Sequence, residues 1–279
     1  MTQVLRSRAE LRAALASVPR PVGLVPTMGW LHDGHRSLIR RARADNPTVV
    51  TTIFVNPRQF SQAQDFTKYP RNEVRDVAIC ADEGVDIVWA PPADEVYVPG
   101  FDTLVSVGAI ALPLEGAARP GHFDGVATVV AILFGLVGAE HAYFGQKDAQ
   151  QVMVIRRMAR DLALPTEVVT CPIVREPDGL ALSSRNVHLS PAERAAAPVL
   201  RQALLAACRQ WGAGERSGDA LRATMRAALA AVPLAQPEYV SVADGLTLRE
   251  LDRIDGEALL SVAVRFGSTR LIDNELLEA

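Results

Sequence analysis

Two histidines three residues apart stand in the segment Pro26–His35, which reads PTMGWLHDGH. The segment follows Val22–Val25, an apolar run that predicts a buried strand, and we expect a helix to begin near Gly34. At a helix start the backbone N–H groups point outward and the helix dipole favours negative charge. His32 and His35 add hydrogen-bond donors there without requiring a permanent charge. These residue types therefore indicate phosphate binding and nucleotide chemistry.

Two other interpretations of this segment stay open from the residues alone. A Gly-rich turn could carry the histidines as exposed caps with no ligand, because short His-x-x-His spacings recur by chance. A zinc ion could instead be held by His32, Asp33 and His35. Zinc sites need three or four ligands, however, and no further strong ligand cluster accompanies these residues.

Polar side chains also follow the strand expected over Thr48–Val55. Asn56 and Gln59, in the segment FVNPRQF, offer neutral donors and acceptors that suit hydroxyl and carboxylate groups. Ligands of open α/β sheets sit at the carboxyl ends of the strands. From the residues alone, a loop whose Asn and Gln side chains cap the next segment is an equally good interpretation.

Lys147 and Asp148 follow the short strand expected over His141–Phe144, in the segment FGQKDAQQ, and open a helix expected over 147–161. A cation there can reach phosphate oxygens, and Asp148 could hold Mg²⁺ directly or through water. Gln151 lies one turn past Lys147 on the same helical face. The structural alternative is an exposed helix start with Asp148 as a cap and Lys147 solvated.

Ser183, Ser184 and Arg185, close to Gly179, combine two hydroxyls with a guanidinium, which suits a phosphate clamp. A polar loop between domains is an equally good explanation. The segment GHFDGV opens an apolar helix expected over 126–137, with Asp124 as its N-cap. Neither GxxxxGK[ST] nor GxGxxG occurs in the chain, so neither a P-loop NTPase nor a dinucleotide dehydrogenase is supported.

The composition bounds the class of protein. The chain has 279 residues, 49% of them apolar and 22% charged, which is typical of a globular protein with a sizeable core. The net charge of −3 leaves no basic footprint for nucleic acid. Three well-separated cysteines fit a reducing cytoplasm. The longest apolar run, Val126–Gly138, is too short to span a bilayer, and the N-terminus lacks the apolar core of a secretory signal.

Apolar periodicity indicates which elements position these side chains. We expect helices over 3–16, 35–44, 73–83, 126–137 and 147–161, and strands over 22–25, 48–55, 85–89, 103–107, 141–144 and 166–170. Alternating strands and helices predict an α/β domain over 1–174 with a Rossmann-like, mainly parallel sheet. Two Ala-rich helical patterns within 191–231 and strands over 238–242 and 259–266 predict a smaller α+β domain over 175–279.

Taken together and in order, these segments resemble the pantoate–β-alanine ligase (pantothenate synthetase) family of the HxGH-type nucleotidyltransferases. The resemblance covers nearly the whole chain. It rests on PTMGWLHDGH, FVNPRQF, YPR, LEGAARPGHFDGVATVV, FGQKDAQQ, VREPDGLALSSRN and GSTRLIDN.

The resemblance implies an enzyme with a two-step reaction. The carboxylate of (R)-pantoate attacks the α-phosphorus of ATP, which gives pantoyl adenylate and pyrophosphate. The amine of β-alanine then attacks the adenylate and releases pantothenate and AMP, in the pathway to coenzyme A. The resemblance also implies Mg²⁺, a homodimer and a cytoplasmic location, with no nucleic-acid or membrane partner. Another nucleotidyltransferase of the same superfamily, or a nucleotide-binding protein without activity, is the competing hypothesis.

The resemblance assigns roles residue by residue. His35, His32, Lys147 and Arg185 are the implied catalytic residues, with His35 as the family's proton donor. The implied ATP contacts are Met28, Gly29, Trp30, Leu31, His32, Asp33, Gly34, His35, Gly145, Gln146, Lys147, Asp148, Val174, Leu182, Ser183, Ser184 and Arg185. Gln59 is expected to bind pantoate and border the β-alanine site, and Gln151 to bind pantoate. From its residue type and position, Asn56 is also expected to bind substrate. Asp148 is the implied Mg²⁺ ligand, and Asp76 supports the geometry of the site.

Two residues depart from the family pattern. Gln146 stands where the family usually has Glu, and we expect it to point away from the phosphates. Trp30 stands where a small residue is common, so its bulk must fit against the first helical turn or narrow the pocket. Neither change removes an implied catalytic group.

Overall fold

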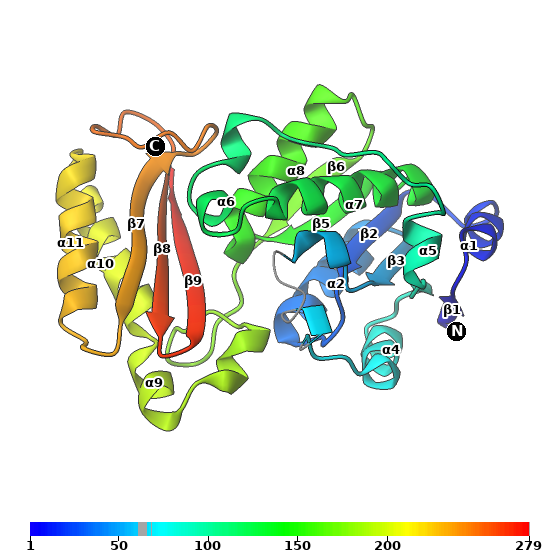
Figure 1. Cartoon of the computed structure of the whole chain (residues 1–279), viewed down its shortest axis with the longest axis horizontal. Helices are drawn as coiled ribbons and strands as arrows, with labels where there is room; N and C mark the ends of the chain where they lie inside the picture. Colours follow the sequence, from blue (N-terminus) through cyan, green and yellow to red (C-terminus); the bar gives the residue numbers. More distant parts are fainter. Residues whose placement is uncertain (61–65, 68, 279) are drawn as a thin grey trace. The chain divides into compact units, whose positions relative to one another are not determined.

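The structure is a computed structural model that describes residues 1–60, 66–67 and 69–278 (Figure 1). The chain divides into two compact units. The first contains residues 1–146 and 150–172, and the second contains residues 147–149 and 173–279. The short segment Lys147–Ala149 therefore groups with the second unit, although the residues on both sides of it belong to the first.

A six-stranded sheet forms the centre of the first unit. Its order is β1 (Gln3–Leu5), β4 (Ile87–Trp89), β3 (Thr48–Ile53), β2 (Val22–Thr27), β5 (His141–Gly145) and β6 (Glu167–Cys171). Every neighbouring pair is parallel, which confirms the expected α/β class with a Rossmann-like sheet. The chain runs outward in one direction from β2 to β3 and β4, and in the other from β5 to β6. The order thus reverses between β2 and β5, where open α/β sheets bind ligands.

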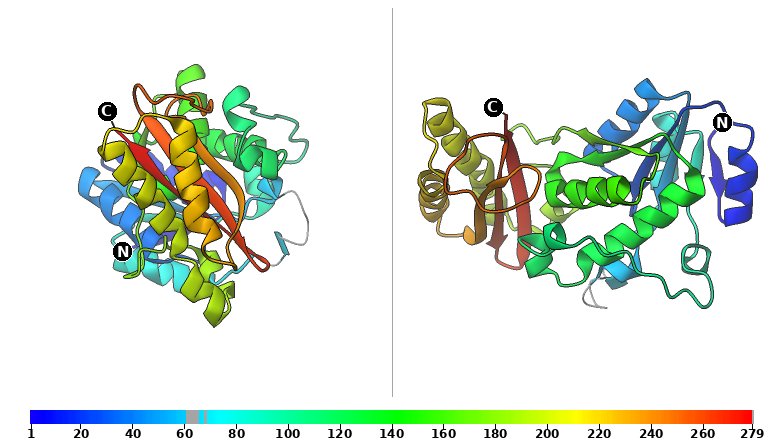
Figure 2. Two further views of the ribbon diagram at one scale, coloured as in Figure 1. Left: turned by 90° about the vertical axis from the view of Figure 1, so that its left-hand side faces the viewer. Right: turned by 90° about the horizontal axis from the view of Figure 1, so that it is seen from above.

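Helices connect these strands as crossovers. They are α1 (Arg8–Leu15), α2 (Asp33–Asp45), α4 (Glu73–Asp82), α5 (Ala93–Val96), α6 (Glu115–Ala118), α7 (His122–Val137) and α8 (Ala149–Asp161), with 3₁₀ turns η1 (Pro57–Gln59), η2 (Ala109–Ala111) and η3 (Gln146–Asp148). The helices α2 and α7 lie on opposite faces of the sheet (Figure 2). This is the arrangement that the usual right-handed connections give when the strand order reverses between β2 and β5. Leu38, Ile39 and Ala42 line the buried side of α2, which packs against β2, β3 and β5.

Four sequence-based expectations in this unit are wrong. The helix expected over 3–16 is instead strand β1 followed by α1, because residues 3–5 pair with β4 and Ser7 caps the helix by accepting from Glu10 N. The strand expected over 103–107 is absent from this described segment, where Val105 N donates to Thr128 Oγ1 instead of a neighbouring strand. Asp124 is not an N-cap, because α7 begins at His122 after the left-handed Gly121. The helix expected from 147 begins at Ala149, after the 3₁₀ turn η3.

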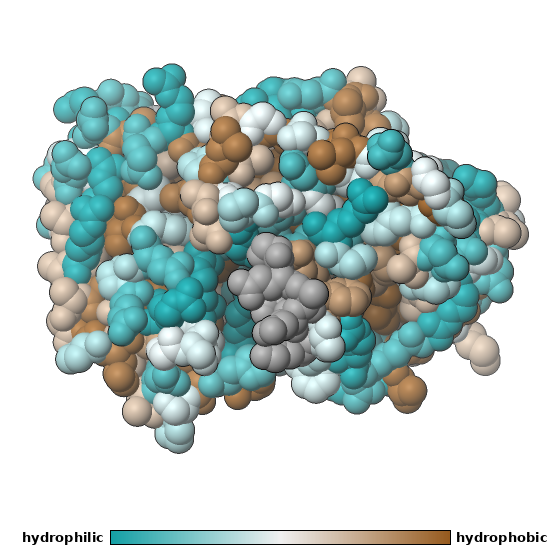
Figure 3. All heavy atoms as spheres, in the orientation of Figure 1, coloured by the Kyte–Doolittle hydropathy of each residue, from teal (hydrophilic) through white to brown (hydrophobic). Residues whose placement is uncertain are grey.

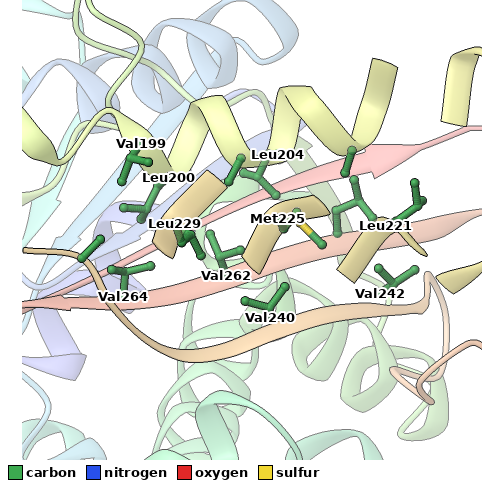
Figure 4. Close-up of a cluster of buried hydrophobic side chains, with 14 of the residues drawn as sticks. Val199, Leu200, Leu204, Leu221, Met225, Leu229, Val240, Val242, Val262 and Val264 are labelled. Carbon is green, nitrogen blue, oxygen red and sulfur yellow. The ribbon is translucent and has the colours of Figure 1, made fainter. Parts of the chain in front are cut away.

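The second unit packs helices on an antiparallel sheet of three strands, β7 (Gln236–Asp244), β8 (Ala258–Phe266) and β9 (Thr269–Leu277). Its helices are α9 (Pro191–Ala196), α10 (Val199–Gly212) and α11 (Gly218–Ala230), and η4 (Ser184–His188) is a 3₁₀ turn. Leucines of α10 and α11 and valines of β7 and β8 meet in its core (Figure 4). Two elements differ from expectation, since the Ala-rich segment holds three helices and β9 was not predicted.

The surface drawn in Figure 3 mixes hydrophilic and hydrophobic residues. None of the described helices is long and apolar enough to cross a membrane.

The buried thiol of Cys80 should make the folded protein less stable as the pH rises into the alkaline range. Cys80 is fully buried in the core of the first unit, and this burial raises the pKa of its thiol from 9.0 to about 12. Above pH 9 the unfolded chain therefore loses a proton that the folded protein keeps, so stability falls as the pH rises. We expect this group alone to lower the free energy of unfolding by about 1 kcal/mol between pH 7 and pH 10.

Urea unfolding of the wild type and of Cys80→Ala at both pH values measures this effect. The difference between pH 7 and pH 10 should be smaller in the variant by that amount, whatever the variant loses at pH 7. An identical pH dependence in the two proteins would show that Cys80 ionises normally in the fold.

Candidate active site

The segment from Met28 to His35 leaves the carboxyl end of β2, beside the point where the strand order reverses. The turn contains two residues with positive φ, Gly29 at 81° and Trp30 at 53°. Glycine adopts such a conformation readily, whereas a tryptophan pays a strain cost that its surroundings must offset. The Arg75 guanidinium stacks on the Trp30 ring at 5.3 Å, so the ring is held at this turn.

Asp76 of α4 fixes the backbone of this turn. Its carboxylate is 1% exposed and accepts from Trp30 N at 2.7 Å and from Leu31 N at 2.8 Å. A Cβ at Gly29 would lie 2.9 Å from Asp76 Oδ2, so the close approach of carboxylate and turn requires glycine. Asp76 thus acts on this segment by holding the backbone of Trp30 and Leu31, just before the histidines.

The two histidines share the start of α2. His32 is the N-cap, and its Nδ1 accepts from Gly34 N at 3.1 Å, while Nδ1 of His35 accepts from His32 N at 3.2 Å. The ring centroids lie 4.1 Å apart. Because both Nδ1 atoms are acceptors, a neutral ring carries its proton on Nε2 in each case. Each imidazole can therefore donate from Nε2 while the helix start contributes its own partial positive charge.

Asn56 and Gln59 belong to a buried network at the carboxyl end of β3. Asn56 Nδ2 donates to Gln59 Oε1 and to Gly125 O, both at 3.1 Å, and the Tyr97 hydroxyl donates to Asn56 Oδ1 at 2.6 Å. Burial raises the pKa of Tyr97 to about 12, so its hydroxyl stays a donor at neutral pH. Asn56 and Gln59 are 1% and 8% exposed. The network therefore holds the side chains of Asn56 and Gln59, the two amides that the sequence predicts to lie in the site.

Two members of this network were missed from the sequence. Tyr97 follows the four-residue helix α5, which has no long periodic pattern to reveal it. The ring nitrogen Nδ1 of His122 lies 2.8 Å from Gln59 O, and its position in the GHFDGV motif was the available signal. Gly125 of that motif lets α7 approach η1, because a Cβ there would lie 2.3 Å from Arg58 O.

A side-chain contact between Met28 and Gln59 links the Met28–His35 segment to the Asn56–Gln59 segment. Gln59 Nε2 lies 2.9 Å from Met28 Sδ, so the ends of β2 and β3 bring together two residues 31 positions apart. Gly145 is the last residue of β5, the strand next to β2 in the sheet, and Gln146 begins the 3₁₀ turn η3. Gln151 is half-buried in the first turn of α8. Its neighbour Gln150 is buried and holds the 110–115 segment through Ile110 O, Pro113 O and Glu115 N.

The other predicted residues lie in the second unit. The side chain of Lys147 is only 17% exposed, so the solvated lysine of the structural alternative is wrong, and its Nζ lies 3.8 Å from Asp148 Oδ1. Leu182 N donates to Val174 O at 2.9 Å, which closes a hairpin over 174–182. Ser183 caps η4 by accepting from Arg185 N at 3.3 Å.

Ser184 begins η4, and the side chain of Arg185 is exposed. The segment after the hairpin therefore carries a hydroxyl and an exposed guanidinium two residues apart. Among the described residues, no group of three or more His, Cys, Asp or Glu side chains is arranged to hold a metal ion. The geometry thus gives the zinc interpretation of His32, Asp33 and His35 no support.

Comparison with known proteins decides the family. The family model described as pantoate-beta-alanine ligase matches residues 3–276. The chain belongs to the pantoate–β-alanine ligase family. It is 61% identical to pantothenate synthetase of Roseiflexus sp. strain RS-1 over 277 residues, which cover 99% of this chain and all of that protein. The predicted function, a ligase that forms pantothenate, is thereby confirmed.

Solved structures of this family share the fold. The crystal structure of pantothenate synthetase from Thermus thermophilus has a TM-score of 0.93 and 50% identity, covering 98% of each chain. Pantoate-beta-alanine ligase from Francisella tularensis, complexed with beta-gamma ATP and beta-alanine, has a TM-score of 0.79 and 31% identity, covering 99% of this chain and 98% of that one.

Proposed function

We propose that this ligase joins (R)-pantoate to β-alanine through a pantoyl-adenylate intermediate and uses ATP as its adenylyl donor. The observation that carries the proposal is the Met28–His35 segment, with its two Nε2 donors at a helix start beside the strand-order reversal. The full-length family match and the Francisella relative complexed with ATP and β-alanine support it.

In the first step, the pantoate carboxylate attacks the α-phosphorus of ATP, the bond from this phosphorus to the bridging oxygen breaks, and pyrophosphate leaves. We assign Nε2 of His32 and His35 to the phosphate oxygens that gain charge in this transition state. Lys147 and Arg185 offset charge on the leaving phosphates, and residues 29–34, 145–148, 174 and 182–184 border the nucleotide. Adenylation is needed because a free carboxylate is a poor acyl donor.

In the second step, the amine of β-alanine attacks the acyl carbon of the adenylate, AMP leaves and the ammonium loses its proton to solvent. Gln59, Gln151 and Asn56 are assigned to pantoate, with Gln59 also bordering β-alanine. Neutral amides suit a hydroxy acid better than a phosphate acceptor, which disfavours another nucleotidyltransferase as the alternative. Tyr97 and His122 hold Asn56 and Gln59 in place through the buried network.

Asp148 fits a Mg²⁺ ligand, because its carboxylate is 49% exposed and Mg²⁺ is commonly held by one or two carboxylates together with substrate phosphates. The ion would supply charge neutralisation of the triphosphate. We further propose that the protein is a cytoplasmic homodimer. Residues 1–174 are proposed to form the domain that binds the nucleotide and pantoate. Residues 175–279 are assigned to a lid, whose closure would keep the adenylate from water.

A single assay tests the function. Purified protein with ATP, Mg²⁺, pantoate and β-alanine should release AMP, and pantothenate should form in equal amount. Omitting β-alanine should leave pantoate-dependent exchange of labelled pyrophosphate into ATP. AMP release that ignores pantoate, or adenylyl transfer to a phosphate acceptor, would reject the proposal.

Replacing Gln59 by alanine tests the pantoate pocket. Loss of an amide that contacts hydroxyl and carboxylate groups should raise the KM for pantoate by about tenfold to hundredfold, while the KM for ATP changes by less than about threefold. Steady-state kinetics with each substrate varied in turn measure both values. Gln202→Ala on α10, where the side chain is exposed, is the control. Equal increases for pantoate and ATP would place the pantoate pocket elsewhere.

A further inference from the structure

Strand β9 carries two adjacent polar residues that are almost completely buried. Asp273 is 1% exposed and Asn274 is 3% exposed. They lie in the GSTRLIDN motif near the C-terminus, to which no role has been assigned. The Asp273 carboxylate accepts from Arg175 Nη1 at 2.7 Å and from Arg175 Nη2 at 3.0 Å. A buried ion pair adds little net stability compared with apolar packing, so its presence here calls for another explanation.

Asn274 holds the main chain at Lys147. Its Nδ2 donates to Lys147 O at 3.0 Å, across 127 residues of sequence. Its own backbone is held in turn, because Asn274 N donates to Asp273 Oδ1 at 2.8 Å. This contact lies within the second unit, which contains Lys147–Ala149 as well as β9.

Asp273, the neighbour of Asn274 on β9, is linked through Arg175 to the hairpin over 174–182 that precedes Ser183 and Arg185. Arg175, held by Asp273, also donates to Gly179 O at 3.1 Å, and residues 175 and 181 form a β-bridge. The turn η4 packs against β9 as well. The two phosphate-binding segments of the second unit are therefore both attached to one point on β9.

We propose that Asn274 is a positioning residue. By fixing the backbone of Lys147, it determines where the Lys147 ammonium contacts the ATP phosphates. This inference rests on the proposed function of Lys147. An ammonium on a flexible four-carbon stem is placed only as well as its backbone is, and a displacement of about 1 Å can cost about a hundredfold in rate. Asp273 supports Asn274 by holding its backbone N–H.

The test compares two buried asparagines that make the same kind of bond. Asn46 is also 3% exposed, and its Nδ2 donates to Ala42 O at 2.8 Å in the first unit. Asn274→Ala should lower the single-turnover rate of pantoyl-adenylate formation at saturating ATP by about tenfold to hundredfold. Asn46→Ala should change this rate by less than about twofold, although both variants lose thermal stability. Equal rate losses in the two variants, or no loss in Asn274→Ala, would overturn the proposal.

A double-mutant cycle shows whether Asn274 acts through Lys147. In a Lys147→Ala background, Asn274→Ala should lower the rate by less than about twofold further, because the group that it positions is gone. The same tenfold or greater loss in both backgrounds would overturn the proposal. Asn274→Ser, a smaller change, takes the place of the alanine variant if that variant does not fold. Wild-type protein that makes no adenylate would instead reject the proposed function, so the two failures are distinguishable.

Discussion

Lys147→Ala should lower kcat for pantothenate formation by about a hundredfold to a thousandfold, the usual effect of removing a group that stabilises transition-state charge. The Lys147 ammonium lies 3.8 Å from the half-exposed Asp148 carboxylate, and an ion pair of this kind adds little stability, so the fold should survive. Steady-state kinetics and a thermal melt of the same preparation measure both results. A near-normal kcat would refute the role of Lys147 in the reaction.

The control for Lys147→Ala is Arg160→Ala, in the last turn of α8, where an exposed guanidinium pairs with Asp161. It removes a cation from the far end of the helix that follows Lys147 and should leave kcat within about twofold, as expected for an exposed ion pair.

A chemical test is also available, because Lys68 and Lys147 are the two lysines of the chain. Saturating ATP should slow acylation of Lys147 by an amine-reactive reagent, as followed by mass spectrometry of the peptide that contains it. Unchanged labelling of Lys147 would contradict a phosphate contact.

Asp76→Ala should have the second large effect, and it should act on stability and activity together. The buried carboxylate accepts two backbone N–H groups, and a hydrogen bond to a charged group contributes about 1.5–3 kcal/mol. Loss of both bonds should lower the free energy of unfolding by about 3–5 kcal/mol. It should also release the strained turn at Trp30, so the adenylation rate falls at a temperature where the variant is still folded.

Chemical denaturation, and single-turnover kinetics well below the melting point of the variant, measure these losses. Asp76→Asn keeps one acceptor oxygen and should lose about half as much stability. Asp82→Ala, on the same helix with a side chain that is 69% exposed, should lose less than about 1 kcal/mol. If the Asp82 and Asp76 variants lose equal stability, the two N–H bonds do not hold the turn.

Periodicity predicted most of the sheet correctly. Thr48–Ile53 and Val22–Thr27 are β-branched or apolar runs that are buried on both faces, and such runs read as parallel strands without further information. Local sequence patterns gave wrong predictions where pairing with a distant part of the chain decides the conformation. Residues 3–5 look helical on apolar spacing but form β1, because pairing with β4 satisfies their backbone groups. The segment 103–107 looks like a strand, but in the described structure no strand pairs with it.

The sequence by itself determined the family and the chemical identity of the candidate site, because HxGH, FVNPRQF, FGQKDAQQ and SSRN each carry their functional groups within a few residues. Only the tertiary structure decided which groups hold them. Asp76 under the Trp30 turn, Tyr97 on Asn56 and Asn274 on Lys147 O act across 46, 41 and 127 residues. Hydrogen bonds of this kind depend on where two distant backbones meet, and no local pattern of residue types records that distance.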